Sequence, residues 1–222
     1  MKPIIGIVSR PMKNETNRDV LATYKKASDA IISFGGIPIM IIPPITTNYD
    51  EELSINNKQE LEYVLNRCDG ILLQGGDNFY KYDEFIAKYA YNHNIPTLGI
   101  CLGMQLMSFI FNGKMGHVKN HLSDEKYVHQ NNIIKNTKLY NILNIENINV
   151  NSRHKDYVIS TDLKVNSISS DGIIEGVEAS NKDFFIGVQW HPETMIDYEK
   201  NVCLIFQSFI NACLKHQNSN YS

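Results

Sequence analysis

The sequence predicts an α/β fold in which helices flank a mostly parallel central sheet, with a small antiparallel region in the second half of the chain. Short apolar runs alternate with segments of helical periodicity over the first 110 residues, as in consecutive βαβ units. Much of the stretch 148–179 instead alternates apolar and polar residues, as in antiparallel strands with one wet face. Because 222 residues suffice for one sizeable core, we expect a single domain at 1–216 and a polar tail at 217–222.

The composition argues against a nucleic-acid-binding or membrane protein. The formal net charge is −3 and the isoelectric point is near 6.2, which favours neither nucleic acid nor an anionic membrane as a partner. The four cysteines show no Cys-x-x-Cys spacing, which fits a reducing compartment. No secretory signal precedes the first apolar run, and the longest run, at 37–45, is interrupted by prolines and too short to cross a bilayer. We therefore expect a soluble, cytoplasmic protein.

A βαβ unit is predicted at the start of the chain. The continuous apolar run at 3–8 is typical of a strand buried on both faces. After a polar loop at 9–17, apolar residues recur at nearly helical spacing from 21 to 34, and Gly35-Gly36 ends the helix. The next apolar run, at 37–42, is then a strand parallel to the first.

A second unit leads to a pair of glycines. A polar loop at 46–58, a helix at 59–67 and a strand at 69–74 are expected before Gly75-Gly76, and a helix at 82–92 is expected after it. Two glycines at a strand end can turn a backbone N–H toward a reacting carbonyl with no side chain in the way. A plain turn uses the same residues, so the pattern alone leaves both interpretations open.

Cys101 stands where a strand turns directly into a helix. An apolar strand is predicted at 95–100 and a helix at 104–111, and the sequence between them is Gly-Ile-Cys-Leu-Gly. Flanking glycines permit a tight elbow that pushes the central side chain out at the carboxyl edge of the sheet. The helix N-terminus supplies free N–H groups and positive potential, which favour a thiolate. The alternative is a buried structural cysteine.

The stretch 113–130 is predicted to be a polar loop that carries two histidines four residues apart. His117 and His121 would have metal-ligand spacing on a helix. No third ligand is evident and the surrounding residues are polar and charged, so we expect a solvated surface with no metal and no cofactor. Mixed strand and turn follow at 131–143 and 148–151, and the alternating segments lie at 157–159, 163–169 and 173–179.

A further apolar strand, at 184–189, leads into Trp190-His191-Pro192-Glu193, and a helix is predicted at 202–214. A cysteine nucleophile needs an imidazole to accept its proton and return it to the leaving amine, and the imidazole needs an acceptor that fixes its tautomer. Cys101, His191 and Glu193 supply these three groups. We therefore predict that they form a catalytic triad.

Gly-Ile-Cys-Leu-Gly-Met-Gln at 99–105 and Gly-Val-Gln-Trp-His-Pro-Glu at 187–193 resemble the two signature motifs of class I glutamine amidotransferases. The resemblance covers almost the whole chain and implies the flavodoxin-like fold of that superfamily. It implies that Cys101 is the nucleophile, His191 the base and Glu193 its partner, with an oxyanion hole formed by the N–H groups of Gly76 and Leu102. It also implies substrate-binding roles for Gly75, Gln105, Asn151, Ser152, Arg153 and His154.

Finer features resemble the γ-glutamyl hydrolase branch, peptidase family C26, which includes γ-glutamyl-γ-aminobutyrate hydrolases. These are Lys-Pro-Ile-Ile-Gly-Ile at 2–7, Asp-Gly-Ile-Leu-Leu-Gln-Gly-Gly-Asp at 69–77 and Ile-Glu-Gly-Val-Glu-Ala at 174–179. The branch implies a hydrolase that acts alone and cleaves the γ-glutamyl amide of a small conjugate through a γ-glutamyl thioester. The alternative is a glutaminase subunit that supplies ammonia to a separate synthetase. A non-catalytic relative is disfavoured because all three triad residues are present, and whether the protein forms a homodimer is left open.

Three departures from the branch concern the leaving-group side. Leu102 replaces the arginine common after the nucleophile, Asn78-Phe79-Tyr80 replaces Val-Asp-Pro, and His154-Lys155-Asp156 replaces the frequent His-His-Gln. The amine released is therefore expected to differ from γ-aminobutyrate. Arg153 and Lys155 would suit an anionic leaving group if they face it, and are ordinary surface charges if they do not.

Overall fold

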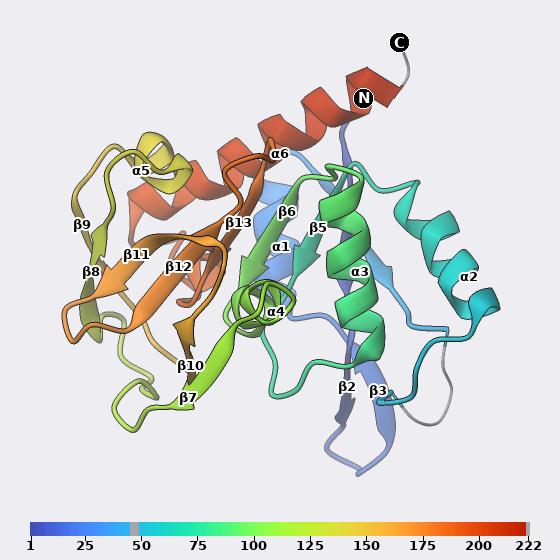
Figure 1. The fold of residues 1–222 in the computed structure, drawn as a ribbon, viewed down its shortest axis with the longest axis horizontal. Coiled ribbons are helices and arrows are strands. Elements are labelled where there is room, and N and C mark those ends of the chain that lie inside the picture. Colours follow the sequence, from blue (N-terminus) through green and yellow to red (C-terminus); the bar gives the residue numbers. More distant parts are fainter. Residues whose placement is uncertain (45–48, 221–222) are drawn as a thin grey trace.

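The computed structural model describes residues 1–44 and 49–220. Within these ranges one mixed sheet of eleven strands runs through the molecule, in the order β4-β1-β5-β6-β13-β12-β11-β8-β9, with β10 and β7 attached beside β12 (Figure 1). The first five strands of this order are mutually parallel: β4 (Ile37–Ile41), β1 (Ile4–Val8), β5 (Gly70–Leu73), β6 (Thr97–Ile100) and β13 (Phe185–Val188). The parallel strands β5, β6 and β13 are buried along their whole length, which explains their continuous apolar runs.

The other strands are antiparallel and belong to the second half of the chain. Register shifts in the β11–β12 pairing increase the twist of this part of the sheet. Their bounds are β12 (Ile174–Glu178), β11 (Lys164–Ser169), β8 (His129–Ile133), β9 (Asn147–Val150), β10 (Asp156–Ser160) and β7 (Lys114–His117).

Helices cover the two faces of the sheet and create two hydrophobic cores (Figure 1). One face packs against α1 (Lys25–Ser33), α5 (Lys138–Leu143) and α6 (Lys200–Asn220), and the other packs against α2 (Ile55–Leu65), α3 (Lys81–Asn92) and α4 (Leu102–Phe109). The mostly parallel α/β architecture and its antiparallel region are therefore confirmed. None of the helices within the described ranges has the length and apolar character needed to cross a membrane.

Several local predictions were wrong. Part of the stretch expected to be mixed strand and turn at 131–143 is the helix α5, which the Thr137 hydroxyl caps. The expected loop at 9–17 contains β2 (Arg10–Lys13), which pairs with β3 (Asp19–Ala22) in a hairpin closed by Asn17 at φ 57°, so α1 starts at Lys25. The expected loop at 113–130 contains β7 and the first residues of β8. Of the expected loop at 46–58, residues 46–48 lie outside the described residues, while α2 begins at Ile55, capped by the Ser54 hydroxyl.

The predicted polar tail at 217–222 is helical as far as it is described. Helix α6 continues to Asn220, and residues 221–222 lie outside the described residues. Gln217 is buried, and its Nε2 donates a hydrogen bond to Asp69 Oδ2 at 2.8 Å. The end of α6 therefore packs against Asp69, the residue just before β5. Because a polar residue makes this contact, the pattern of apolar residues did not predict it.

Candidate active site

Cys101 occupies a strained backbone position between β6 and α4. Its φ is 53° and its ψ is −107°, a combination that L-residues seldom adopt. The turn needs small neighbours, because a Cβ on Gly103 would collide with the Leu73 carbonyl and one on Gly99 with the Met107 side chain. The Cys101 N–H donates to Val188 O at 2.9 Å, which ties the elbow to the neighbouring strand β13. The Gly-x-Cys-x-Gly pattern therefore forms the expected elbow.

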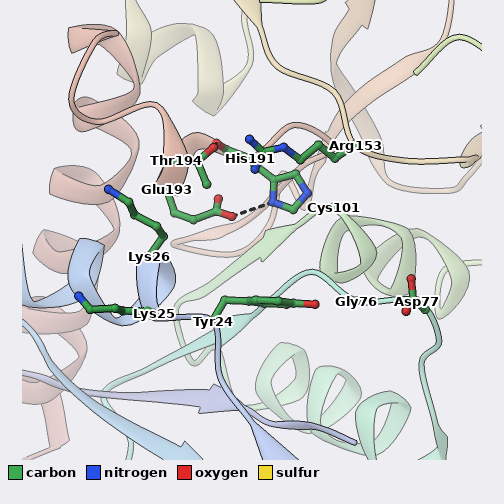
Figure 2. Close-up of a pocket in the computed structure, with 10 residues that line it drawn as sticks. All are labelled: Tyr24, Lys25, Lys26, Gly76, Asp77, Cys101, Arg153, His191, Glu193 and Thr194. Atoms are coloured by element: carbon green, nitrogen blue, oxygen red, sulfur yellow. Dashed lines mark hydrogen bonds and ion pairs between the residues drawn. The ribbon is translucent and has the colours of Figure 1, made fainter. Parts of the chain in front are cut away.

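His191 follows β13 directly, and Glu193 lies in the short 3-10 helix Pro192–Thr194. The imidazole Nδ1 and Glu193 Oε1 are 2.7 Å apart (Figure 2). A Cβ built on Gly75 would lie 3.0 Å from His191 Cε1 and 3.7 Å from Cys101 Cβ, so both side chains border this glycine. The three predicted triad residues are thus brought together.

The environment favours the charged form of His191. Burial alone lowers the pKa of His191, but the charge of Glu193 and the hydrogen bonds to Cys101 and Glu193 outweigh burial and raise it to about 10. An imidazolium beside a thiol stabilises the thiolate. The arrangement can therefore hold a nucleophilic sulfur next to a proton donor.

The predicted oxyanion residues lie side by side. A Cβ on Gly76 would lie 3.2 Å from Leu102 Cδ2, and Leu102 begins α4, where the N–H has no acceptor within the helix. Gly76 is also against Arg10, whose buried guanidinium pairs with Asp83 Oδ2 at 2.6 Å and donates to Gln74 O at 3.4 Å. This pair fixes the backbone that leads into Gly75-Gly76.

Cys101, His191 and Glu193 line a cavity of about 400 Å³ (Figure 2). Burial and the charge of Asp77 raise the pKa of Tyr24, which keeps its hydroxyl a hydrogen-bond donor at this wall. Three cations contribute to the lining: Lys25 pairs with Asp29 and Lys26 with Asp197, whereas Arg153 forms no ion pair within the described ranges. The remaining lining residues are Gly76, Asp77 and Thr194.

A second cavity, of about 190 Å³, adjoins the first through residues that line both, among them Cys101 and Arg153. Gln105 lines it and is held by hydrogen bonds from its Nε2 to Asp156 O at 2.8 Å and to Gln189 Oε1 at 3.1 Å. Lys155 lies here too. The two cavities give a substrate room on both sides of Cys101.

The Peptidase C26 family model matches residues 80–193, a span that contains Cys101, His191 and Glu193. A putative glutamine amidotransferase of Schizosaccharomyces pombe, PB2B2.05, is 30% identical over 220 residues, which cover 85% of this chain and 81% of that protein. The chain belongs to the peptidase C26 family. Another relative, the γ-glutamyl-γ-aminobutyrate hydrolase PuuD of Escherichia coli, is 29% identical, and the alignment covers 96% of this chain and 94% of PuuD.

The fold of this peptidase C26 family member is that of class I glutamine amidotransferases. The crystal structure of a putative GMP synthase protein from Thermoplasma acidophilum superposes with a TM-score of 0.70 at 19% sequence identity. The superposition covers 99% of this chain and 98% of that one. The predicted fold is thereby confirmed.

The structure places the predicted substrate-binding residues in three different situations. Gln105, Arg153 and His154 line the cavities, whereas Asn151 and Ser152 are buried and hold backbone. Asn151 accepts from His191 N at 2.8 Å and donates to His191 O at 3.1 Å, and the Ser152 hydroxyl donates to His121 O at 2.7 Å. Gly75 keeps room for His191. In this C26 protein, Asn151 and Ser152 therefore shape the site indirectly, by holding the backbone of His191 and of His121.

Sequence reasoning missed the residues that support Gly75-Gly76. Gln74 is buried, donates to Val8 O and Ala22 O, and accepts from Tyr24 N at 2.8 Å. Arg10 and Asp83 form the buried pair beside it. One signal was present, because Arg10 follows an apolar parallel strand at its carboxyl end, where functional residues of α/β proteins gather.

The two histidines singled out in the sequence do not meet. His117 is exposed and its Nδ1 lies 2.9 Å from Asp156 Oδ1. His121 instead lies with His129, His154 and Glu175, and the four ligand atoms are within 4.8 Å of one another. The expectation of a solvated surface around His121 was therefore wrong, because strand pairing brings together residues that are distant in the chain.

Proposed function

We propose that the protein is a cysteine-dependent hydrolase that cleaves the γ-glutamyl amide of a small conjugate and releases glutamate and an amine. The observation that carries the proposal is the strained elbow that sets Cys101 beside the His191–Glu193 pair in one cavity. Backbone strain at a nucleophile is a common feature of active sites. The similarity to PuuD along nearly the whole chain supports the γ-glutamyl substrate class.

In the proposed reaction, the Cys101 thiolate attacks the γ-carbonyl carbon, and the N–H groups of Gly76 and Leu102 stabilise the oxyanion. The His191 imidazolium gives its proton to the leaving nitrogen, the C–N bond breaks, and a γ-glutamyl thioester remains on Cys101. Neutral His191 then takes a proton from water, the resulting hydroxide attacks the thioester, and glutamate leaves as the thiolate is restored. Glu193 holds the imidazole in place through Nδ1 and stabilises its charge.

The lining of the larger cavity favours an anionic leaving group. Arg153, Lys25 and Lys26 lie there with two carboxylates, Asp77 and Glu193, and the glutamate is engaged with His191. Lys155 lines the adjoining cavity. A carboxylate or phosphate on the amine product would pair with Arg153, which is exposed and has no ion pair within the described part of the chain.

The second candidate is a glutaminase subunit that passes ammonia to a separate synthetase. It is supported by Leu102, which is the residue usual after the nucleophile in true amidotransferases, and by the likeness to the putative GMP synthase protein of Thermoplasma acidophilum. A glutaminase of this kind would hydrolyse glutamine slowly alone and faster with its synthetase. A stand-alone hydrolase would need no partner.

Glutamate release by the purified protein separates the candidates. The panel contains glutamine, γ-glutamyl-γ-aminobutyrate and γ-glutamyl phosphoramidates, and the variants are Cys101→Ala and, as a matched control, Cys203→Ala, which removes a thiol outside the cavity. We expect release from one conjugate, abolished only in Cys101→Ala. Activity with glutamine alone that rises when a synthetase is added would favour the second candidate, and a fully active Cys101→Ala variant would contradict both.

A further inference from the structure

Four side chains that could bind a metal converge behind the wall of the smaller cavity. His121 lies in the loop between β7 and β8, His129 begins β8, His154 lies in the β9–β10 loop and Glu175 is on β12. Glu175 is fully buried, and the side chains of His121 and His154 are each 2% exposed. We propose that these four residues bind a structural zinc ion, in a site distinct from the triad of Cys101, His191 and Glu193.

The spacing of the four donor atoms fits one tetrahedral ion. Glu175 Oε1 lies 3.4 Å from His154 Nε2, 3.5 Å from His121 Nδ1 and 3.7 Å from His129 Nε2, and the two nitrogens of His121 and His154 are 3.2 Å apart. Zinc bonds of about 2.0–2.1 Å in a tetrahedron place neighbouring donors about 3.3–3.5 Å apart. The remaining two donor pairs are within 4.8 Å, so only His129 has to move inward.

The outer hydrogen bonds fix which nitrogen of each imidazole faces the cluster. His121 Nε2 is 2.9 Å from Asp171 Oδ2, and His154 Nδ1 is 2.9 Å from the Asp156 carbonyl oxygen. Both partners are acceptors, so these nitrogens carry the protons. In the neutral tautomers His121 Nδ1 and His154 Nε2 then direct lone pairs at each other and at Glu175. A carboxylate or carbonyl behind a ligating histidine is the usual support of a metal site.

The centre of the cluster leaves polar atoms without partners. Asn131 donates to Glu175 Oε2, whereas Glu175 Oε1 in the described structure contacts only the three imidazole nitrogens, at 3.4–3.7 Å and without good hydrogen-bond geometry. Neither ring nitrogen of His129 has a hydrogen-bond partner there either, although its side chain is only 9% exposed. Buried polar atoms are seldom left unpaired in folded proteins. A cation at this point would satisfy Glu175 Oε1 and His129 Nε2 together with the two converging lone pairs.

The donor set favours zinc, and the closed geometry favours a structural role. Three imidazoles with one carboxylate suit zinc better than magnesium or calcium, which prefer oxygen ligands. Four protein ligands leave no open coordination position for a reacting water. The ion would join β8 and β12 to the segment 151–154, whose Asn151 holds the His191 backbone and whose Arg153 lines the larger cavity.

Zinc stoichiometry of the purified protein tests the proposal. Protein stripped with a chelator is dialysed against zinc-buffered solution, and the metal content is measured by mass spectrometry. We expect one zinc per chain in the wild type and in His117→Gln, an exposed histidine outside the cluster, and loss of zinc in His121→Gln and His129→Gln. Asp171→Asn, which alters a half-exposed outer partner, should weaken affinity about 10–100-fold.

The visible spectrum of the protein with bound cobalt is a second test, and it needs no variant. Co²⁺ bound in place of zinc should show the strong visible absorption of a tetrahedral site. Wild-type protein that retains no zinc above the level of His129→Gln, or a weak octahedral cobalt spectrum, would overturn the proposal and leave a cluster that shares protons only. The wild-type zinc stoichiometry and the cobalt spectrum each test the proposal without any variant. The proposal can therefore be refuted even if a variant fails to fold.

Discussion

Replacing Glu193 with glutamine should move the alkaline limit of activity to lower pH. The pKa of His191 is raised to about 10, and Glu193 Oε1 lies 2.7 Å from Nδ1, so its charge is a main cause. An opposite charge at this range typically raises the pKa of an imidazole by about 1–3 units. Without it, the pKa of His191 should fall to about 7–9, while the influence of Cys101 on the pKa remains.

The direction follows from the role of the imidazolium. His191 must be protonated to give a proton to the leaving amine, so the rate falls as the pH rises through its pKa. A lower pKa therefore moves that fall to lower pH. The glutamine amide also disturbs the imidazole tautomer, which in a serine triad costs up to about 10⁴ in kcat, and we expect a smaller loss here because a thiolate needs less activation.

The measurement is kcat/KM for glutamate release across the pH range in which both proteins stay folded. NMR titration of the His191 imidazole reads the same ionisation without a substrate. Asp197→Asn is the matched control, because this exposed carboxylate pairs with Lys26 and not with His191. An alkaline limb at the same pH in wild type and Glu193→Gln would refute the assignment of Glu193 as the partner that charges His191.

Two further variants test the surroundings of the site. Asp83→Ala should lower the free energy of unfolding by about 3–5 kcal/mol, because it leaves the buried Arg10 guanidinium unpaired. Urea denaturation measures this loss, and the control Asp19→Ala, which breaks an exposed ion pair, should cost only about 0–1 kcal/mol. Equal losses in the two variants would contradict the argument. Arg153→Ala should raise KM about 10–100-fold for conjugates with an anionic leaving group and leave KM for glutamine unchanged, whereas an equal rise for both would mean that Arg153 does not face the leaving group.

The parts of the fold that local periodicity controls could be predicted from the sequence. Strands β1, β5, β6 and β13 are continuous apolar runs because they are buried on both faces. The hairpin of β2 and β3 could not be predicted, because its strands are short, half-exposed and carry Pro11, and because its turn uses Asn17 at positive φ instead of glycine. The end of α6 was missed since a polar residue, Gln217, makes the buried contact.

The same distinction applies to the sites. Cys101, His191 and Glu193 stand in two contiguous motifs, and each follows a parallel strand, so the edge on which they meet was predictable. The histidine cluster draws on four segments between 121 and 175. The β8–β11–β12 pairing brings His129 near Glu175, whereas the Leu122–Arg153 bridge and the hydrogen bond from His154 N to His121 O bring the other two histidines together. The register shifts within that pairing cannot be read from alternation, so spacing along the chain suggested His117 as the partner of His121, whereas the fold supplies His154.

The backbone around Cys101 explains how a strained nucleophile is maintained. A conformation of this kind costs about 1–3 kcal/mol and persists only where neighbours determine it. Here Ile100 is in register with Val188, the Cys101 N–H donates to Val188 O, and Gln105 N donates to Cys101 O at 3.1 Å. These contacts are all made by the backbone, and Gly103 and Gly99 supply the space. The strain therefore belongs to the strand–helix junction and not to the thiol, which is why Cys101→Ala should fold and still lack the nucleophile.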